Sequence, residues 1–208
     1  MGPEDLEIET LMDNGSDRLT GEQRYSLLRS LRELLLVLLA AALLAGGSVF
    51  FFRAALVRGS SMEPTLRDGD CIFVQTAGYH QPRQGDIVAI RAKDRQGKHL
   101  IKRIIAVGGQ TVDIDLAAAT VYVDGEALDE PYVKGVTDTI EGTRFPLTLA
   151  EDEVFVMGDH RDHSTDSRSY RLGPVKEGYL QGKAVFLLLP GTTPDLGARE
   201  WGRIGLVQ

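Results

Sequence analysis

The chain has 208 residues, a formal net charge of −7 and a single cysteine, Cys71. An acidic chain lacks the basic patch that nucleic-acid-binding domains need, so we expect no nucleic-acid partner. Because Cys71 stands alone, no intrachain disulfide can form, and packing must hold the fold together.

The chain begins with an acidic segment. Residues 4–17 contain six carboxylates and no aromatic side chain. Such a composition buries too little apolar surface to fold alone. We therefore predict a cytoplasmic tail over residues 1–33 that is disordered at its start.

An uncharged apolar run of 19 residues follows, from Leu34 to Phe52. As a helix it would be about 28 Å long, which matches the hydrocarbon thickness of a bilayer. We predict a transmembrane helix over residues 34–52, in contact with lipid. More arginines precede this run than follow it, so the positive-inside rule predicts a cytoplasmic N-terminus and an extracytoplasmic domain over residues 53–208.

Two other interpretations of the apolar run compete with this one. The small residues at 45–47 would suit the cleavage site of a signal peptide. However, a leader of about 30 residues precedes the run, and its apolar character continues to Phe52, which favours an uncleaved anchor. A buried core helix is disfavoured because aliphatic residues lie on every face.

From residue 70 onward, short β-branched runs alternate with turn signals such as RDG at 67–69 and DG at 124–125. This spacing is typical of an antiparallel sandwich or barrel-like fold, so we predict a mainly β domain over residues 53–208. The segment 130–148 is the least regular and is interpreted as an excursion from the sheet. The predicted strands are 70–75, 86–91, 99–107, 111–115, 120–123, 153–157 and 183–189.

Two separate segments offer a nucleophile and a base. Ser61 lies in the run GSSMEPT at 59–65, where Pro64 fixes φ and stiffens the chain just after the serine. Lys102 lies in the strand pattern LIKRII at 100–105. Burial among isoleucines would lower the pKa of Lys102, so that its neutral amine could take a proton from a serine hydroxyl. Arg103 would point to the opposite face and play a structural role.

A dense polar loop, GDHRDHSTDSR at 158–168, follows the strand predicted at 153–157. Asp166 and Arg168 can form a bidentate ion pair that fixes such a turn. No metal is expected, because a calcium loop that begins at Asp162 requires glycine at position six and glutamate at position twelve, where this chain has Ser167 and Gly173. His160 and His163, without a nearby cysteine, are a poor zinc set.

In this order after one membrane anchor, these segments resemble the bacterial type I signal peptidases. The matching motifs are SMxPT at 61–65, KR at 102–103 and GDxRDxSxDSR at 158–168, with GD at 69–70, GDIV at 85–88 and DEPY at 129–132. The resemblance implies a membrane-anchored Ser/Lys endopeptidase that cleaves signal peptides from exported preproteins after small-x-small sites. It also implies an antiparallel β fold, no cofactor, a monomer, and a bacterial plasma membrane rather than a thylakoid-type membrane.

The resemblance assigns roles to individual residues of this chain. Ser61 would be the nucleophile and Lys102 the general base. Ser164 would hydrogen-bond and orient the lysine amine, and Asp166 with Arg168 would brace the polar loop.

The chain also departs from the family pattern. Some members carry a serine two residues before the nucleophile as an oxyanion donor; here that position is Gly59. The Ser61 amide is then the expected donor, and no second donor is assigned. His160 and His163 stand where asparagine is common in the family, and neither is expected to be catalytic.

The small residues that the resemblance implies before the cut require shallow apolar pockets. An extended substrate could add as a strand beside the lysine strand. Each candidate pocket residue flanks the nucleophile or the base and could instead belong to the core. The candidates are Val57, Met62, Leu66, Ile72, Leu100 and Ile101.

Two rival functions predict different sequence features. A self-cleaving repressor of the SOS type, which also uses a Ser/Lys pair, would carry a DNA-binding domain, and nothing before residue 60 resembles one. A membrane-tethered β module without activity would have lost Ser61 or Lys102, yet both are present.

Overall fold

The structure is a computed structural model that describes residues 21–91, 99–192 and 197–207; the side chains of residues 21, 23, 44, 45 and 48–50 lie outside the described part. The chain forms two compact units, Met1–Gly47 and Ser48–Gln208. The second unit begins five residues before the predicted domain boundary at residue 53. Each unit is considered by itself.

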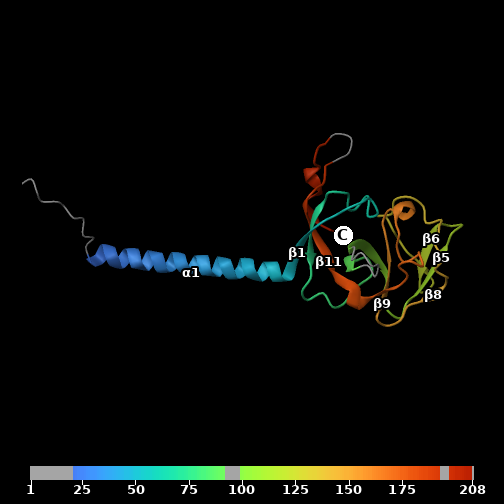
Figure 1. The fold of residues 1–208 in the computed structure, drawn as a ribbon, viewed down its shortest axis with the longest axis horizontal. Coiled ribbons are helices and arrows are strands. Elements are labelled where there is room, and N and C mark those ends of the chain that lie inside the picture. The colour runs from blue at the N-terminus through green and yellow to red at the C-terminus, as the bar shows by residue number, and fades with distance from the viewer. Residues whose placement is uncertain (1–20, 92–98, 193–196, 208) are drawn as a thin grey trace, which may run out of the picture. The chain divides into compact units, whose positions relative to one another are not determined.

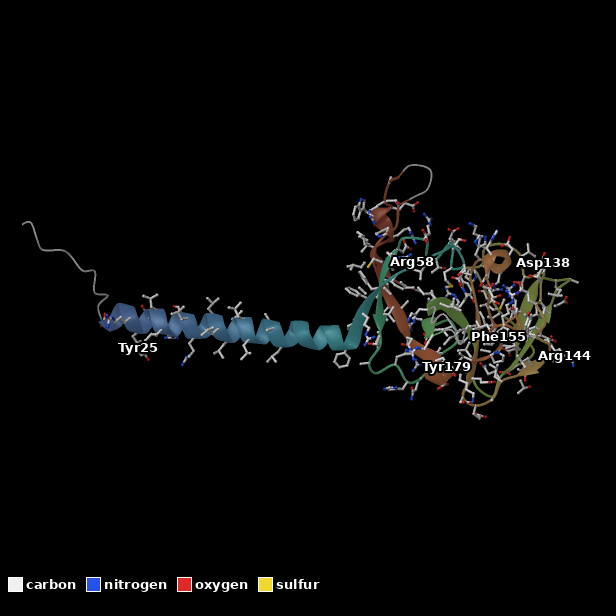
Figure 2. The ribbon with its side chains drawn as sticks, viewed as in Figure 1. Tyr25, Arg58, Asp138, Arg144, Phe155 and Tyr179 are labelled. Atoms are coloured by element: carbon white, nitrogen blue, oxygen red, sulfur yellow. The ribbon has the colours of Figure 1, made fainter. Side chains whose placement is uncertain are left out.

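Helix α1 spans Gly21–Phe51, so the second part of the predicted tail, from residue 21, is helical. Every described side chain of α1 is exposed, including Tyr25 (Figure 2), which retains 74% of its surface. Among the described residues, no helix combines the length and the apolar character needed to cross a membrane. Within the predicted span 34–52, the side chains of residues 44, 45 and 48–50 lie outside the described part, and Phe52 already belongs to a strand.

The larger sheet of the second unit has eight strands, and all its pairs are antiparallel (Figure 1). In spatial order its path is β1 (Phe52–Leu56), β2 (Cys71–Gln75), β11 (Leu180–Leu189), β3 (Ile87–Arg91), β4 (His99–Ala106), β9 (Glu153–Met157) and β10 (Val175–Lys176), with β12 (Gly205–Leu206) paired to β11.

A smaller antiparallel sheet of four strands is inserted between β4 and β9 in the sequence, and its labelled strands lie together in Figure 1. Asp124 and Gly125 join β6 to β7 with φ of 53° and 84°, the positive values that a tight Asp-Gly hairpin turn requires. In spatial order the strands are β7 (Glu126–Ala127), β6 (Thr120–Val123), β5 (Thr111–Asp115) and β8 (Leu147–Thr148).

The prediction of a mainly β, antiparallel fold is confirmed, and all seven predicted strands are present with bounds that differ by three residues or fewer. Five strands were not predicted. Four of them (β7, β8, β10 and β12) have two residues each, too few to show an alternating pattern. The fifth, β1, lies at the end of the apolar run and directly after it.

The predicted excursion, residues 130–148, returns to the polar loop. Isolated bridges join Lys134 to His160 and Glu141 to Ser169. The Arg161 guanidinium donates to both carboxylate oxygens of Glu130, and its Nη1 also donates to Thr137 Oγ1 at 2.7 Å. The excursion is therefore attached to the loop that follows β9.

The core consists of three clusters that the sheets separate. One fills the space between the two sheets, where Phe155 of β9 (Figure 2) meets Phe145 edge to face with ring centroids 5.7 Å apart. A second lies beneath the segment that carries Ser61 and includes Met62, Leu66 and Ile72. The third packs against β3, β4 and β9 and includes Val88, Ile104 and Val156. Neighbouring residues of β4 thus pack into different clusters, with Ile105 in the first and Ile104 in the third.

Candidate active site

Ser61 lies in the connection between β1 and β2, which is anchored on both sides of the serine. At its ends, the Val57 amide donates to the Asp70 carbonyl at 2.8 Å and the Gly69 amide to the Val57 carbonyl at 3.0 Å. Met62, beside the serine, is 2% exposed and packs into the core. This combination of backbone pairing and side-chain burial holds the serine in place without a helix or strand.

Lys102 extends from β4 to the serine. Its side chain is buried, and Nζ donates a hydrogen bond to Ser61 Oγ at 2.7 Å. Burial lowers the pKa of Lys102 from 10.5 to about 8, because an ammonium loses its hydration in the interior. The carboxylates of Asp166 and Asp159 oppose this shift. The expected depressed lysine pKa is confirmed, and a neutral amine is therefore accessible near neutral pH.

The polar loop after β9 is held by the predicted Asp166–Arg168 ion pair, which is present and buried. Arg168 donates from Nε and Nη2 to the two carboxylate oxygens of Asp166, both at 2.9 Å. Asp166 Oδ2 also accepts the Gly158 amide at 3.0 Å, and Arg168 Nη2 reaches the Arg161 carbonyl at 2.6 Å. The pair therefore fixes both ends of the loop.

The predicted hydrogen bond from Ser164 to Lys102 is absent among the described residues. Ser164 Oγ is buried and has no hydrogen-bond partner there, whereas the lysine amine bonds to Ser61. Ser164 instead packs against Gly158: a Cβ on that glycine would lie 2.3 Å from Ser164 Oγ and 2.4 Å from the Ser61 carbonyl oxygen. Ser164 Oγ and the Ser61 carbonyl oxygen therefore both lie against Gly158. The Ser164 hydroxyl makes no hydrogen bond to the described residues.

A second buried ion pair, which the sequence analysis missed, lies beside the site. Arg103 is indeed structural, but its partner is Asp159, which accepts from Nε at 2.9 Å and Nη2 at 2.8 Å. Asp159 also accepts the Thr65 hydroxyl at 2.5 Å, and the guanidinium lies 3.8 Å from the centre of the Tyr132 ring. The sequence did contain a signal for this pair, because Arg103 lies within an aliphatic strand. A charge buried there requires a partner of opposite charge.

Ser61 and Lys102 line an apolar groove of about 640 Å³. Of the predicted pocket residues, Val57, Met62, Leu100 and Ile101 line this groove. Leu66 and Ile72 do not: both are fully buried in the cluster beneath the serine segment, so their assignment to substrate pockets was wrong. Further lining residues come mainly from β1 and the segment after it, namely Arg53, Ala54, Ala55, Leu56 and Arg58, and His99 of β4 also contributes.

Two strand edges border the groove. Residues 99–102 of β4 pair with β3, and the pairing of β4 with β9 begins only at Arg103. On the other side of the groove, β1 pairs with β2 and is the end strand of the sheet's path. Within the described residues, both edges leave main-chain groups available to an extended chain.

The amides near Ser61 differ in their availability. The Gly59 amide donates to Asp68 Oδ1 at 2.6 Å, so it is already used. Among the described residues, no acceptor faces the Ser61 amide. The serine's own N–H is therefore the donor available to a developing oxyanion.

The residues best suited to hold a metal lie at the start of the polar loop. The ligand atoms of His160, Asp162 and His163 lie within 4.8 Å of one another. From the sequence, Asp162 was considered only as part of a calcium loop and the two histidines only as a zinc pair, and no metal was expected.

Comparisons with known proteins place the chain in a family. The family described as "Signal peptidase, peptidase S26" matches residues 30–189. Signal peptidase I of Bacillus licheniformis is 36% identical over 144 residues, covering 65% of this chain and 75% of that protein. Signal peptidase I T of Bacillus subtilis (strain 168) is 37% identical over 146 residues, covering 65% and 72%.

Two further relatives extend the comparison. The probable signal peptidase I-1 of Synechocystis sp. is 33% identical over 161 residues, covering 72% of this chain and 74% of that protein. A crystal structure of a signal peptidase I from Enterococcus faecalis V583 is 30% identical, with a TM-score of 0.41, and covers 50% of this chain and 97% of that chain.

Proposed function

Because the chain belongs to the signal peptidase family, peptidase S26, we propose that it removes signal peptides from exported preproteins with Ser61 as nucleophile and Lys102 as general base. Membership of the family makes it a peptidase, and therefore a hydrolase. The observation that carries the dyad is the 2.7 Å hydrogen bond from Lys102 Nζ to Ser61 Oγ at the wall of the apolar groove.

The chemistry follows from the two side chains. The neutral amine of Lys102 takes the Ser61 proton as Oγ attacks the scissile carbonyl carbon, which gives a tetrahedral oxyanion. The resulting ammonium returns its proton to the leaving amine, and an acyl-serine ester remains. Lys102 then activates a water that cleaves this ester and regenerates the serine. The Ser61 amide stabilises the oxyanion in both steps.

The groove also supports the choice of substrate. An extended segment before the cut would pair with the free edges of β4 and β1, which border the groove. Its side chains would alternate, and those that face the groove would meet Val57, Met62 and Ile101. A shallow apolar surface of this kind suits small residues at the first and third positions before the cut.

We also propose that the chain is a single-pass protein of the plasma membrane, with residues 34–52 as its span and the catalytic unit outside. The run has no charged side chain, and the described leucines of α1 are exposed, from 46% at Leu27 to 69% at Leu43. A helix that is apolar on all faces requires an apolar environment, which lipid provides. The arginines before the run support a cytoplasmic N-terminus.

The proposal is tested with the full-length protein in detergent and a preprotein that carries a small-x-small site. Ser61→Ala and Lys102→Met should each lower kcat/KM by at least about 10⁴-fold, because nucleophile and base act as one unit. Sequencing the new N-terminus of the product locates the cut. Circular dichroism checks that both variants are folded.

Two results would contradict the proposal. Cleavage that persists in both folded variants would show that another group or a contaminant is responsible. Folded wild-type protein that never cleaves would favour a binding module instead.

A further inference from the structure

The start of the polar loop places two imidazoles and a carboxylate next to the nucleophile segment. His160 is 8% exposed, whereas Asp162 and His163 are exposed to solvent. The rings of the two histidines have centroids 4.4 Å apart. The side chain of Asp162 lies against Gly135, whose added Cβ would meet it at 1.9 Å. The three side chains therefore converge on a small region with access to solvent.

The hydrogen bond of His160 fixes which of its ring nitrogens can bind a metal. Nδ1 lies 3.2 Å from the carbonyl oxygen of Ser60. A carbonyl oxygen can only accept, so the ring donates from Nδ1 and keeps a lone pair on Nε2. A backbone carbonyl on the other ring nitrogen is the usual support for a metal-binding histidine.

The lone pair of Nε2 faces a carboxylate. Asp162 Oδ1 lies 3.5 Å from Nε2, close enough for both atoms to bind one cation. Ligand atoms about 2.1 Å from a tetrahedral zinc ion are about 3.4 Å apart, which matches this separation. His163 supplies a third ligand atom within 4.8 Å of both. The separation of Nε2 and Oδ1 is thus short enough for both atoms to be ligands of one metal ion.

We propose that His160, Asp162 and His163 form a binding site for zinc or another late first-row divalent ion. Two imidazoles and one carboxylate, with a water in the fourth position, are an established tetrahedral zinc set. Imidazole nitrogen favours these ions over calcium or magnesium, which prefer oxygen ligands.

The site is attached to the nucleophile segment through its most buried ligand. The His160 ring bonds to the Ser60 carbonyl, and the His160 amide donates to the Ser61 carbonyl at 3.1 Å. A metal on Nε2 would hold this ring in place and so restrain the two carbonyls. We therefore expect metal binding to raise the melting temperature of the catalytic unit.

The test uses full-length protein in detergent, purified without a histidine tag and freed of metal by a chelator. Calorimetric titration with zinc should give one ion per chain, and cobalt should give the intense visible absorption of a tetrahedral site. His163→Ala and Asp162→Asn should each weaken zinc binding at least about tenfold. The matched control is His80→Ala, an exposed histidine between β2 and β3, which should bind zinc as the wild type does.

The proposal is overturned if zinc does not bind saturably. It is equally overturned if His163→Ala and Asp162→Asn bind as tightly as the wild type. His163 and Asp162 are exposed, so these variants should fold, which melting in the absence of metal verifies. The readout is metal binding, so its failure would leave the proposed peptidase activity unaffected.

Discussion

Lys102 is buried among apolar side chains and near the ion pairs of Asp159 and Asp166. These surroundings determine the pKa of its amine. The pKa of Lys102 is lowered to about 8 by desolvation, which outweighs the nearby carboxylates of Asp166 and Asp159. An amine with this pKa is partly neutral at neutral pH, as the proposed general base must be.

The lowered pKa predicts a specific pH dependence. Only the neutral amine can accept the serine proton, so kcat/KM should rise about tenfold per pH unit below a pKa of about 8 and level off above it. The measurement is kcat/KM on a short peptide substrate across this range, with circular dichroism at each pH to check the fold. A rise centred near 10.5, the ordinary lysine pKa, would show that burial does not tune the base.

Two ion pairs of this chain should differ strongly in their contribution to stability. Asp159 is fully buried against Arg103, whereas the side chains of Arg67 and Glu200 are 38% and 47% exposed. Asp159→Asn leaves a buried guanidinium without its counter-charge and should cost about 3–5 kcal/mol of unfolding free energy. Glu200→Gln makes the same chemical change at the surface and should cost less than about 1 kcal/mol.

Urea denaturation of both variants provides the comparison. Equal losses would mean that the buried pair has no special role in holding the segment around Ser61. A loss confined to Asp159→Asn would support the link between Asp159, Thr65 and the nucleophile segment.

The site residues divide according to whether local sequence determines their contacts. Ser61, Lys102 and the Asp166–Arg168 pair were predictable, because each sits in a recognisable motif. The unpaired hydroxyl of Ser164 was not predictable, because its position depends on how closely Ser164 and the Ser61 carbonyl approach Gly158. Similarly, sequence shows that Leu66 and Ile72 are apolar and near the serine, but not that they point into the core.

At the scale of elements, β1 is the longest strand that could not be predicted from the sequence. β1 begins at Phe52, directly after α1 and at the end of the apolar run. The apolar character of such a short segment does not show whether it is a helix or a strand. The strand forms because it pairs with β2, from Phe52 opposite Gln75 to Leu56 opposite Cys71. This non-local pairing also brings one wall of the groove into place. The strands 111–115, 120–123 and 153–157, bounded by clear turn signals, were predicted without error.

At the junction between β9 and the polar loop, Gly158 lies against the backbone of Ser61, the proposed nucleophile. Gly158 has no room for a side chain, since a Cβ would lie 2.4 Å from the Ser61 carbonyl oxygen. Gly158→Ala should therefore displace the serine and lower kcat by at least about 10²-fold. Gly178→Ala is the control, because nothing lies within 4 Å of its added Cβ.

Peptide cleavage and thermal melting of both glycine variants distinguish the outcomes. If Gly158→Ala keeps wild-type kcat while folded, the close approach is not what places the serine. If both variants lose activity equally, the loss reflects stability rather than the position of Ser61.

At the scale of the whole molecule, the division into two units separates the proposed anchor from the proposed chemistry. Every residue of the dyad, the two buried ion pairs and the groove belongs to the unit that starts at Ser48. Most of α1, including its exposed leucines, belongs to the first unit. The two functions should therefore be separable by a cut at the boundary.

A chain that lacks residues 1–47 tests this separation. It should retain kcat/KM on a short peptide, because no group that bonds, transfers a proton or lines the groove is removed. It should also leave the membrane pellet, because it keeps only residues 48–52 of the apolar run. The full-length protein keeps the whole run and should stay in the pellet through an alkaline carbonate wash. Full-length protein released by carbonate would contradict the anchor. A folded truncated chain without peptidase activity would instead show that the first unit contributes to catalysis.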